Sequence, residues 1–188
     1  ERQELILLYQ PILNLHSKKL LGAEALLRWD HPEQGLLSPD KFISVAEELG
    51  LIIPIGEWAI RNVCYQIHAL QKYIKTPFTI SVNLSPQQFR DRALITTTIE
   101  ALQQANISGE YLTYEITENI IMQNLDHAIL IMNELKSLNV NLALDDFGTG
   151  HSSLNYIKKF PIDILKIDRS FIMDLNKDSR TAGAIIKT

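Results

Sequence analysis

The chain has 188 residues, of which 46% are hydrophobic and 21% are charged, and this balance is typical of a globular domain with one sizeable core. Its formal net charge of -4 argues against a nucleic-acid polymer as partner, while a small anion held through a metal is compatible with it. The apolar runs are too short to cross a bilayer, and no secretory leader opens the chain. We therefore expect a cytoplasmic domain, and the single cysteine, Cys64, excludes an internal disulfide.

The predicted elements begin with two strands and then alternate between helices and strands. Residues 5–13 and 20–29 are predicted strands, and the turn between them is so short that they must be antiparallel. Ser38 and Pro39 predict the start of a helix, and Gly50 predicts its end. The later elements are a helix over residues 55–73, a strand over 78–84, a capping box at 85–88, a helix over 93–105, a strand over 112–117, a helix over 125–138, a strand over 140–146, a helix over 152–159, a strand over 162–168 and a helix over 179–187.

Alternating strands and helices predict a parallel sheet whose strands all end at the same edge. Two topologies are compatible with this pattern, an open doubly wound sheet and a closed barrel. An open sheet usually carries a glycine-rich phosphate turn, and no such turn follows the first strands here. Polar residues at the ends of at least five strands favour the rim of an eight-stranded α/β barrel. Only six strands are predicted, so we expect the last two to be missing from the chain.

Four of the predicted strands end in residues with oxygen ligands. Because side chains alternate between the two faces of a strand, Glu24, Asn83, Glu115 and Asp145 are expected on one face and at one rim. Two carboxylates about 5 Å apart repel by roughly 3 kcal/mol at an effective dielectric of about 20, so several carboxylates together favour the binding of a cation. Oxygen donors without cysteine or histidine select Mg²⁺ or Mn²⁺ over zinc.

The remaining polar strand ends allow more than one interpretation. The adjacent Asp145 and Asp146 are expected on different sides of their strand, where they could serve two metals or form only a solvated acidic turn. Paired metals suit hydrolysis at phosphorus, and Lys166 could then hold the attacking water, although a surface ion pair is the alternative. For Glu118, the alternative is an exposed position at the start of the next connection.

Six motifs follow one another along the chain: YQPI at residues 9–12, EALLRW at 24–29, VNLS at 82–85, EITE at 115–118, DDFGTG at 145–150 and KID at 166–168. In this order they resemble the EAL domain family of bacterial cyclic di-GMP phosphodiesterases. The resemblance spans residues 1–188 as a single domain. It implies a modified TIM barrel with one antiparallel strand, and hydrolysis of cyclic di-GMP to linear pGpG with Mg²⁺ or Mn²⁺, through two ions.

The resemblance also implies roles for individual residues. Lys166 would act near the catalytic water, and Glu118 would steady the loop that begins at Asp146. His151 stands where the family commonly has tyrosine, and we expect a modest effect of this difference. The metal ligands would be Glu24, Asn83, Glu115, Asp145 and Asp146. The substrate-side residues would be Gln10, Leu27, Arg28 and Asp168.

The family continues with a Glu-x-x-Glu-type motif and a Gln-Gly-Tyr-type motif, and no segment of this chain matches either of them. We therefore expect a domain that is incomplete at its C-terminus, and little or no activity of the 188-residue chain itself. The resemblance implies a homodimer fused to sensory or GGDEF-type modules, which could be the cytoplasmic part of a membrane-anchored parent. Two alternatives remain: a receptor that binds cyclic di-GMP without cleaving it, and an enolase-like Mg²⁺ barrel with Lys166 as base, which fits Gln10 and Arg28 poorly.

Overall fold

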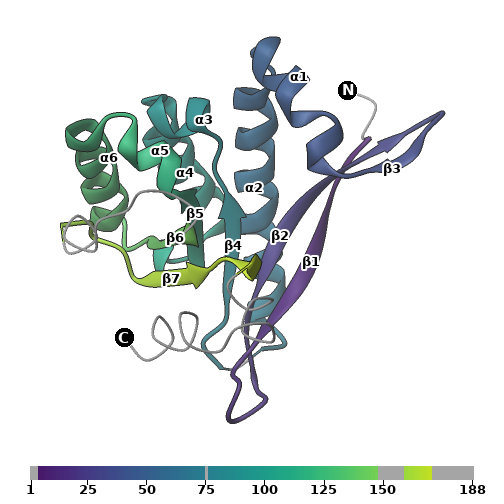
Figure 1. Ribbon diagram of the computed structural model, residues 1–188. Coiled ribbons are helices and arrows are strands. Elements are labelled where there is room, and N and C mark those ends of the chain that lie inside the picture. The colour runs from purple at the N-terminus through teal and green to yellow at the C-terminus, as the bar shows by residue number, and fades with distance from the viewer. Residues whose placement is uncertain (1–3, 75, 148–158, 171–188) are drawn as a thin grey trace.

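The computed structural model describes residues 4–74, 76–147 and 159–170, and within them seven strands form one sheet. The order across the sheet is β1-β2-β4-β5-β6-β7, and β3 pairs with the far end of β2. The β1–β2 pair is antiparallel, whereas β2, β4, β5, β6 and β7 run parallel (Figure 1). The strands are β1 Leu5–Leu13, β2 Leu20–His31, β3 Gly35–Leu37, β4 Thr79–Asn83, β5 Leu112–Thr117, β6 Asn141–Phe147 and β7 Ile164–Ile167.

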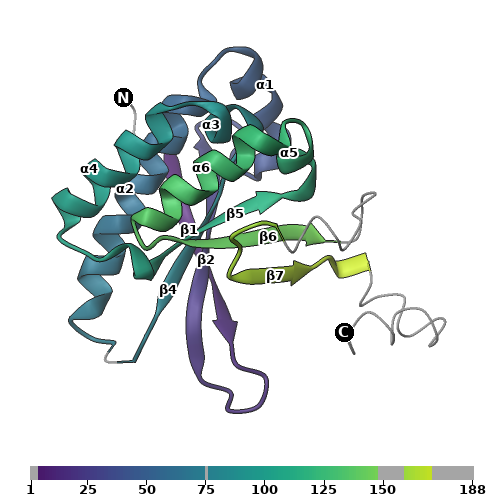
Figure 2. The ribbon, with the colours of Figure 1, turned by 90° about the vertical axis from the view of Figure 1, so that its left-hand side faces the viewer.

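Helices cover one face of this sheet and leave the other face to the strand side chains (Figure 2). Helices α2, α4 and α6 lie side by side on the covered face, each packed in the crossover between two parallel strands. No helix in the described part of the chain combines the length and the apolar character that a membrane span requires. The helices are α1 Ile43–Glu48, α2 Ile52–Gln71, α3 Pro86–Arg90, α4 Ala93–Ala105, α5 Glu118–Met122 and α6 Leu125–Ser137, with 3₁₀ turns at Pro39–Lys41 and Gly109–Tyr111.

The predicted α/β fold with an antiparallel first pair is confirmed, and the bounds of β1, β5 and α4 agree with the predicted ones. The predicted helix from Ser38 to Gly50 is wrong as a single element. The Ser38 hydroxyl donates to Asp40 and caps no backbone N–H group, so a 3₁₀ turn precedes the short α1. No sequence pattern predicted β3 or α5, and the helices predicted over 152–159 and 179–187 lie outside the described residues apart from Lys159.

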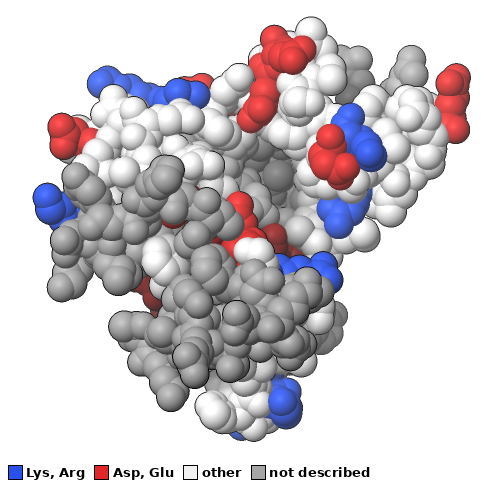
Figure 3. Space-filling model, viewed as in Figure 1, with Lys and Arg blue, Asp and Glu red and all other residues white. Residues whose placement is uncertain are grey.

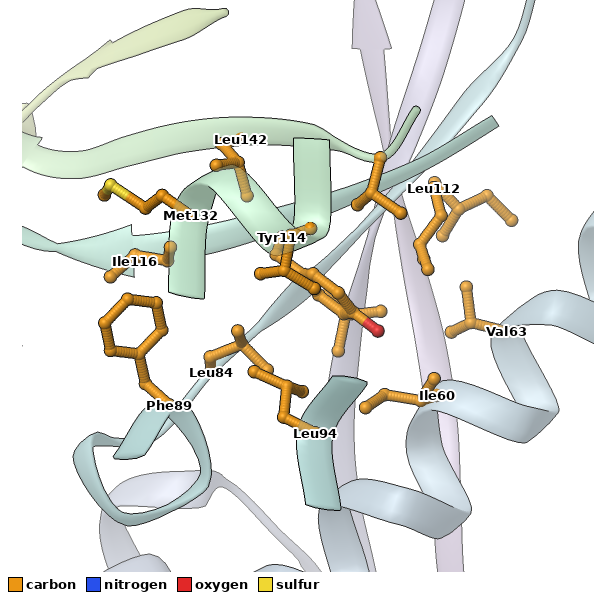
Figure 4. Close-up of a cluster of buried hydrophobic side chains, with 14 of the residues drawn as sticks. Ile60, Val63, Leu84, Phe89, Leu94, Leu112, Tyr114, Ile116, Met132 and Leu142 are labelled. Atoms are coloured by element: carbon orange, nitrogen blue, oxygen red, sulfur yellow. The ribbon is translucent and has the colours of Figure 1, made fainter. Parts of the chain in front are cut away.

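The core lies between the sheet and the helices, and β5 shows how it forms. Leu112, Tyr114 and Ile116 alternate along this central strand and are 0%, 0% and 1% exposed among the side chains of α2, α4 and α6 (Figure 4). The buried Tyr114 hydroxyl lies 2.7 Å from Thr98 Oγ1 on α4, which satisfies both groups. Since side chains alternate along a strand, Thr113 and Glu115 must point to the face without helices.

The turn after β4 is held against α2 by the predicted capping box, which the structure confirms. The Ser85 side chain accepts from the Gln88 N–H, and the Gln88 side chain accepts from the Ser85 N–H. Gly56 on α2 makes room for this turn, because a Cβ at Gly56 would lie 1.7 Å from Gln88 Nε2. The close approach of Gln88 to Gly56 holds this turn against α2, and Asn83 lies two residues before Ser85, the first residue of the capping box.

Candidate active site

Three acidic side chains from three different strands converge on one lysine. The Lys166 ammonium on β7 lies 3.2 Å from Glu24 Oε2 on β2 and 3.1 Å from Asp145 Oδ2 on β6. It also pairs with Glu115 on β5. At the end of β4, Asn83 donates a hydrogen bond of 2.8 Å to Glu24 Oε1. These five residues form one connected polar group, which we call the carboxylate–lysine cluster.

The register of the sheet explains why the cluster forms. Asn83 lies directly opposite Glu115 in the β4–β5 pair. Glu24 lies opposite the residue two positions before Asn83, and Asp145 lies opposite the residue two positions after Glu115. Since a shift of two residues keeps a side chain on the same face, all four residues point away from the helices, as the alternation of the sequence predicts.

Burial and charge oppose each other in this cluster. Glu115 is 2% exposed, and its burial raises the pKa of the carboxyl group. The hydrogen bond and the charge of Lys166 lower that pKa, while Glu24 and Asp145 raise it further. Burial also disfavours the Lys166 ammonium, but the contact with Glu115 and the three negative charges outweigh this and raise its pKa. The lysine is therefore held as a cation among carboxylates.

A β-bulge changes the placement of the two adjacent aspartates. Leu144 pairs with Leu165 and Phe147 pairs with Ile167, so Asp145 and Asp146 together face the single residue Lys166. Asp146 has a left-handed backbone with φ of 54°, and its N–H donates to Asp145 Oδ1 at 3.0 Å. Partial burial, followed by the charges of Asp145 and Asp168, raises the pKa of Asp146. Asp146 thus lies within electrostatic reach of the cluster, which strict alternation along a strand does not predict.

Two predicted substrate-side residues lie on β1 and β2 beside the cluster. Gln10 is exposed and lies directly opposite Glu24 in the β1–β2 pair, so it shares the face of the cluster. Arg28 is on the same face by alternation and donates from Nη1 to the Leu27 carbonyl at 2.7 Å. Both side chains therefore lie on the open face, and Gln10 is directly beside Glu24.

The other two predicted substrate-side residues are placed differently. Leu27 lies on the opposite face of β2 and lines an apolar cavity of about 330 Å³ together with Ile55 and Leu84. Asp168, just after β7, accepts hydrogen bonds from the Ser170 hydroxyl and from its N–H at 2.9 Å, and these bonds lower the pKa of the carboxyl group. The structure thus brings Asp168 close to the cluster through β7 but directs Leu27 away from it.

Glu118 occupies the first position of α5 and is buried at 6% exposure. Its Oε2 atom has no hydrogen-bond partner among the residues that the structure describes. A buried carboxylate without a partner is costly, so this oxygen is available to a further group. The alternative interpretation of Glu118 as an exposed residue is wrong.

The donor set of the cluster suits a hard divalent cation. Glu24, Glu115 and Asp145 supply carboxylate oxygens that already surround one positive charge, and Asn83 adds an amide. Within residues 4–74, 76–147 and 159–170, however, no three His, Cys, Asp or Glu side chains have the arrangement of a metal site. The chemistry of these residues fits Mg²⁺ or Mn²⁺, and their role as ligands stays a prediction. Figure 3 shows acidic side chains beside a hollow near the middle of this view.

Two residues that the sequence analysis did not single out hold the start of β7. They are Lys136 on α6 and Asp163 just before the strand, which form an ion pair of 2.7 Å. They are far apart in the sequence and belong to no periodic pattern. Only the fold could reveal them.

Comparisons with known proteins agree with the geometry. Residues 1–187 match the EAL domain family. In Pseudomonas aeruginosa, the bifunctional diguanylate cyclase/cyclic di-GMP phosphodiesterase MucR is 40% identical over 185 residues, and the cyclic di-GMP phosphodiesterase NbdA is 41% identical over 186 residues. The alignments cover 98% and 97% of this chain but 27% and 24% of those proteins, so the chain spans about a quarter of their length.

A solved structure of the PaMucR phosphodiesterase in complex with c-di-GMP has the same fold, with a TM-score of 0.92 at 39% identity. The superposition covers 98% of this chain and 74% of that chain. The likeness confirms the predicted modified TIM barrel, whose first two strands are antiparallel. The chain therefore belongs to the EAL domain family.

Proposed function

We propose that this domain hydrolyses one phosphodiester bond of cyclic di-GMP, with two Mg²⁺ or Mn²⁺ ions, and yields linear pGpG. The observation that carries the proposal is the convergence of Glu24, Glu115, Asp145 and Lys166 from four different strands on one face of the sheet. Two relatives that are about 40% identical are named as cyclic di-GMP phosphodiesterases, which supports the same chemistry here.

Each residue of the site has a role in this proposal. The divalent ions, when bound, would polarise a water molecule and offset the negative charge on the phosphate. The Lys166 ammonium orients that water and stabilises charge on the phosphoryl oxygens, and the buried Glu118 steadies the loop that begins at Asp146. The residues proposed to hold the ions are Glu24, Asn83, Glu115, Asp145 and Asp146. The residues proposed to contact the substrate are Gln10, Arg28 and Asp168. Leu27, predicted from the resemblance as a fourth, points to the opposite face of β2 and is not included.

The deciding experiment separates turnover from binding. The chain is incubated at high concentration with cyclic di-GMP and Mn²⁺, and pGpG is followed by chromatography while binding is measured by calorimetry. Glu115→Gln is the matched control, because it keeps the shape of the buried side chain and removes its charge. We expect slow, metal-dependent formation of pGpG by the chain and none by Glu115→Gln. Binding of cyclic di-GMP without any pGpG, by the chain and by the parent protein alike, would instead support a non-catalytic receptor.

The setting of the domain also belongs to this proposal. We infer a cytoplasmic homodimer within a larger protein that carries sensory or GGDEF-type modules, since the named relatives are about four times longer than the matched region. Light scattering of the chain tests the dimer directly, and a monomer at all concentrations would contradict it.

A further inference from the structure

The position of Lys166 depends on a short pairing between β6 and β7. Only Ala143 and Leu144 precede the bulge as regular partners of β7, and Lys166 faces the bulge itself. A slip of one residue would turn the Lys166 side chain to the opposite face of the sheet. Some feature at the start of β7 must therefore hold the register.

Asp163, immediately before β7, supplies that feature. Its N–H donates to the Leu142 carbonyl at 2.9 Å, and its Oδ2 accepts the Leu142 N–H at 2.8 Å. The Asp163 carboxylate thus takes the place of a main-chain carbonyl as the acceptor for the Leu142 N–H, on the edge of β6 that faces β7. Lys136 on α6 donates to both carboxylate oxygens of Asp163, at 2.8 and 2.7 Å, and holds the side chain in this orientation.

We infer that Asp163 is a positioning residue for Lys166: it fixes the register of β7 on β6, and Lys136 fixes Asp163. A charged acceptor forms a stronger hydrogen bond to a backbone N–H than a neutral one, so the carboxylate suits this role. The inference rests on the proposed function where it concerns turnover. Its structural part, the placement of Lys166 against Glu115, stands on the contacts alone.

The test measures the accessibility of Lys166 directly. The folded chain is treated with an amine-acylating reagent, and labelling at Lys166 is quantified by mass spectrometry relative to the exposed Lys41. Asp163→Ala should raise the relative labelling of Lys166 about 5-fold or more, the factor that a loss of one ordinary interaction produces. Asp163→Asn keeps one acceptor for the backbone N–H group but loses the charge and the second acceptor for Lys136, so it should raise the labelling less than Asp163→Ala does.

A matched control removes a similar ion pair elsewhere. Arg61 on α2 pairs with Glu100 on α4 at 2.7 Å, with partly exposed side chains like those of Lys136 and Asp163. Arg61→Met should leave labelling of Lys166 unchanged, whereas Lys136→Met should raise it. If Asp163→Ala does not fold, as circular dichroism would show, the milder Lys136→Met decides the question against Arg61→Met.

Turnover provides the second readout. With cyclic di-GMP as substrate, Lys136→Met and Asp163→Ala should lower kcat and leave KM within about twofold, because the substrate-side residues on β1 and β2 are untouched. Unchanged labelling of Lys166 in both variants would overturn the inference. If labelling rises but neither the unsubstituted chain nor the parent protein makes pGpG, the positioning role stands and the proposed function fails.

Discussion

Replacing Lys166 by methionine tests the carboxylate–lysine cluster most directly. The change keeps most of the side-chain volume but removes the positive charge shared by Glu24, Glu115 and Asp145. At 3.1 and 3.2 Å, two of these contacts are each worth about 5 kcal/mol in gross attraction at an effective dielectric of about 20. The cost of desolvating the charges and the protonation of a carboxylate in the variant offset much of this. Because the Lys166 side chain is 27% exposed, we expect a net loss of about 3 kcal/mol in the free energy of unfolding.

The assay is urea denaturation at neutral pH, first with a chelator and then with Mn²⁺. Lys41→Met is the matched control, because its ion pair with Asp40 is fully on the surface, and it should change stability by no more than about 0.5 kcal/mol. In Lys166→Met, Mn²⁺ should replace the missing positive charge and restore about 2.7 kcal/mol at one hundred times its dissociation constant. The reasoning fails if Lys166→Met is as stable as the unsubstituted chain without metal. An absence of any Mn²⁺ effect would remove the three carboxylates as a cation site.

Three further predictions concern the scaffold. Gly22→Ala would place a Cβ 2.3 Å from the Thr79 carbonyl oxygen and force β2 and β4 apart, so thermal denaturation should show a loss of about 3 kcal/mol, and a neutral effect would contradict this contact. Thr98→Val leaves the fully buried Tyr114 hydroxyl without its partner and should cost about 2 kcal/mol in urea denaturation, whereas a change below about 0.5 kcal/mol would show that the bond is unimportant. Burial raises the pKa of the Cys64 thiol to about 12, so a thiol reagent at pH 8 should label it only in denaturant. Rapid labelling of the native chain would refute the burial of this thiol. Because the thiol ionises at a lower pH in the unfolded chain than in the folded one, Cys64 should also lower the free energy of unfolding as the pH rises from about 9 toward 12.

Local patterns in the sequence account for much of the fold. The bounds of β5 follow from the alternation of Leu112, Tyr114 and Ile116 with polar residues. Ser85 and Gln88 predict the capping box, which the structure confirms. Such signals act over a few residues, because they depend on the period of a strand or on hydrogen bonds near a helix end. A short-range signal can also mislead. The helix predicted to start at Ser38 is not formed as a single element, and the Ser38 hydroxyl bonds to the neighbouring Asp40 side chain instead of capping a helix.

The sequence by itself determined which residues share a face: Glu24, Asn83, Glu115 and Asp145 follow from the period of two along each strand. Alternation assigns a face but gives neither the pairing register nor a bulge, because both depend on the neighbouring strand.

Only the tertiary structure decided which groups meet. It placed Lys166 beside Glu24, 142 residues away along the chain, and brought Asp146 near them through the bulge. It also joined Lys136 to Asp163. These contacts arise between segments distant in the sequence, and their geometry is set by the packing of whole elements rather than by any local pattern.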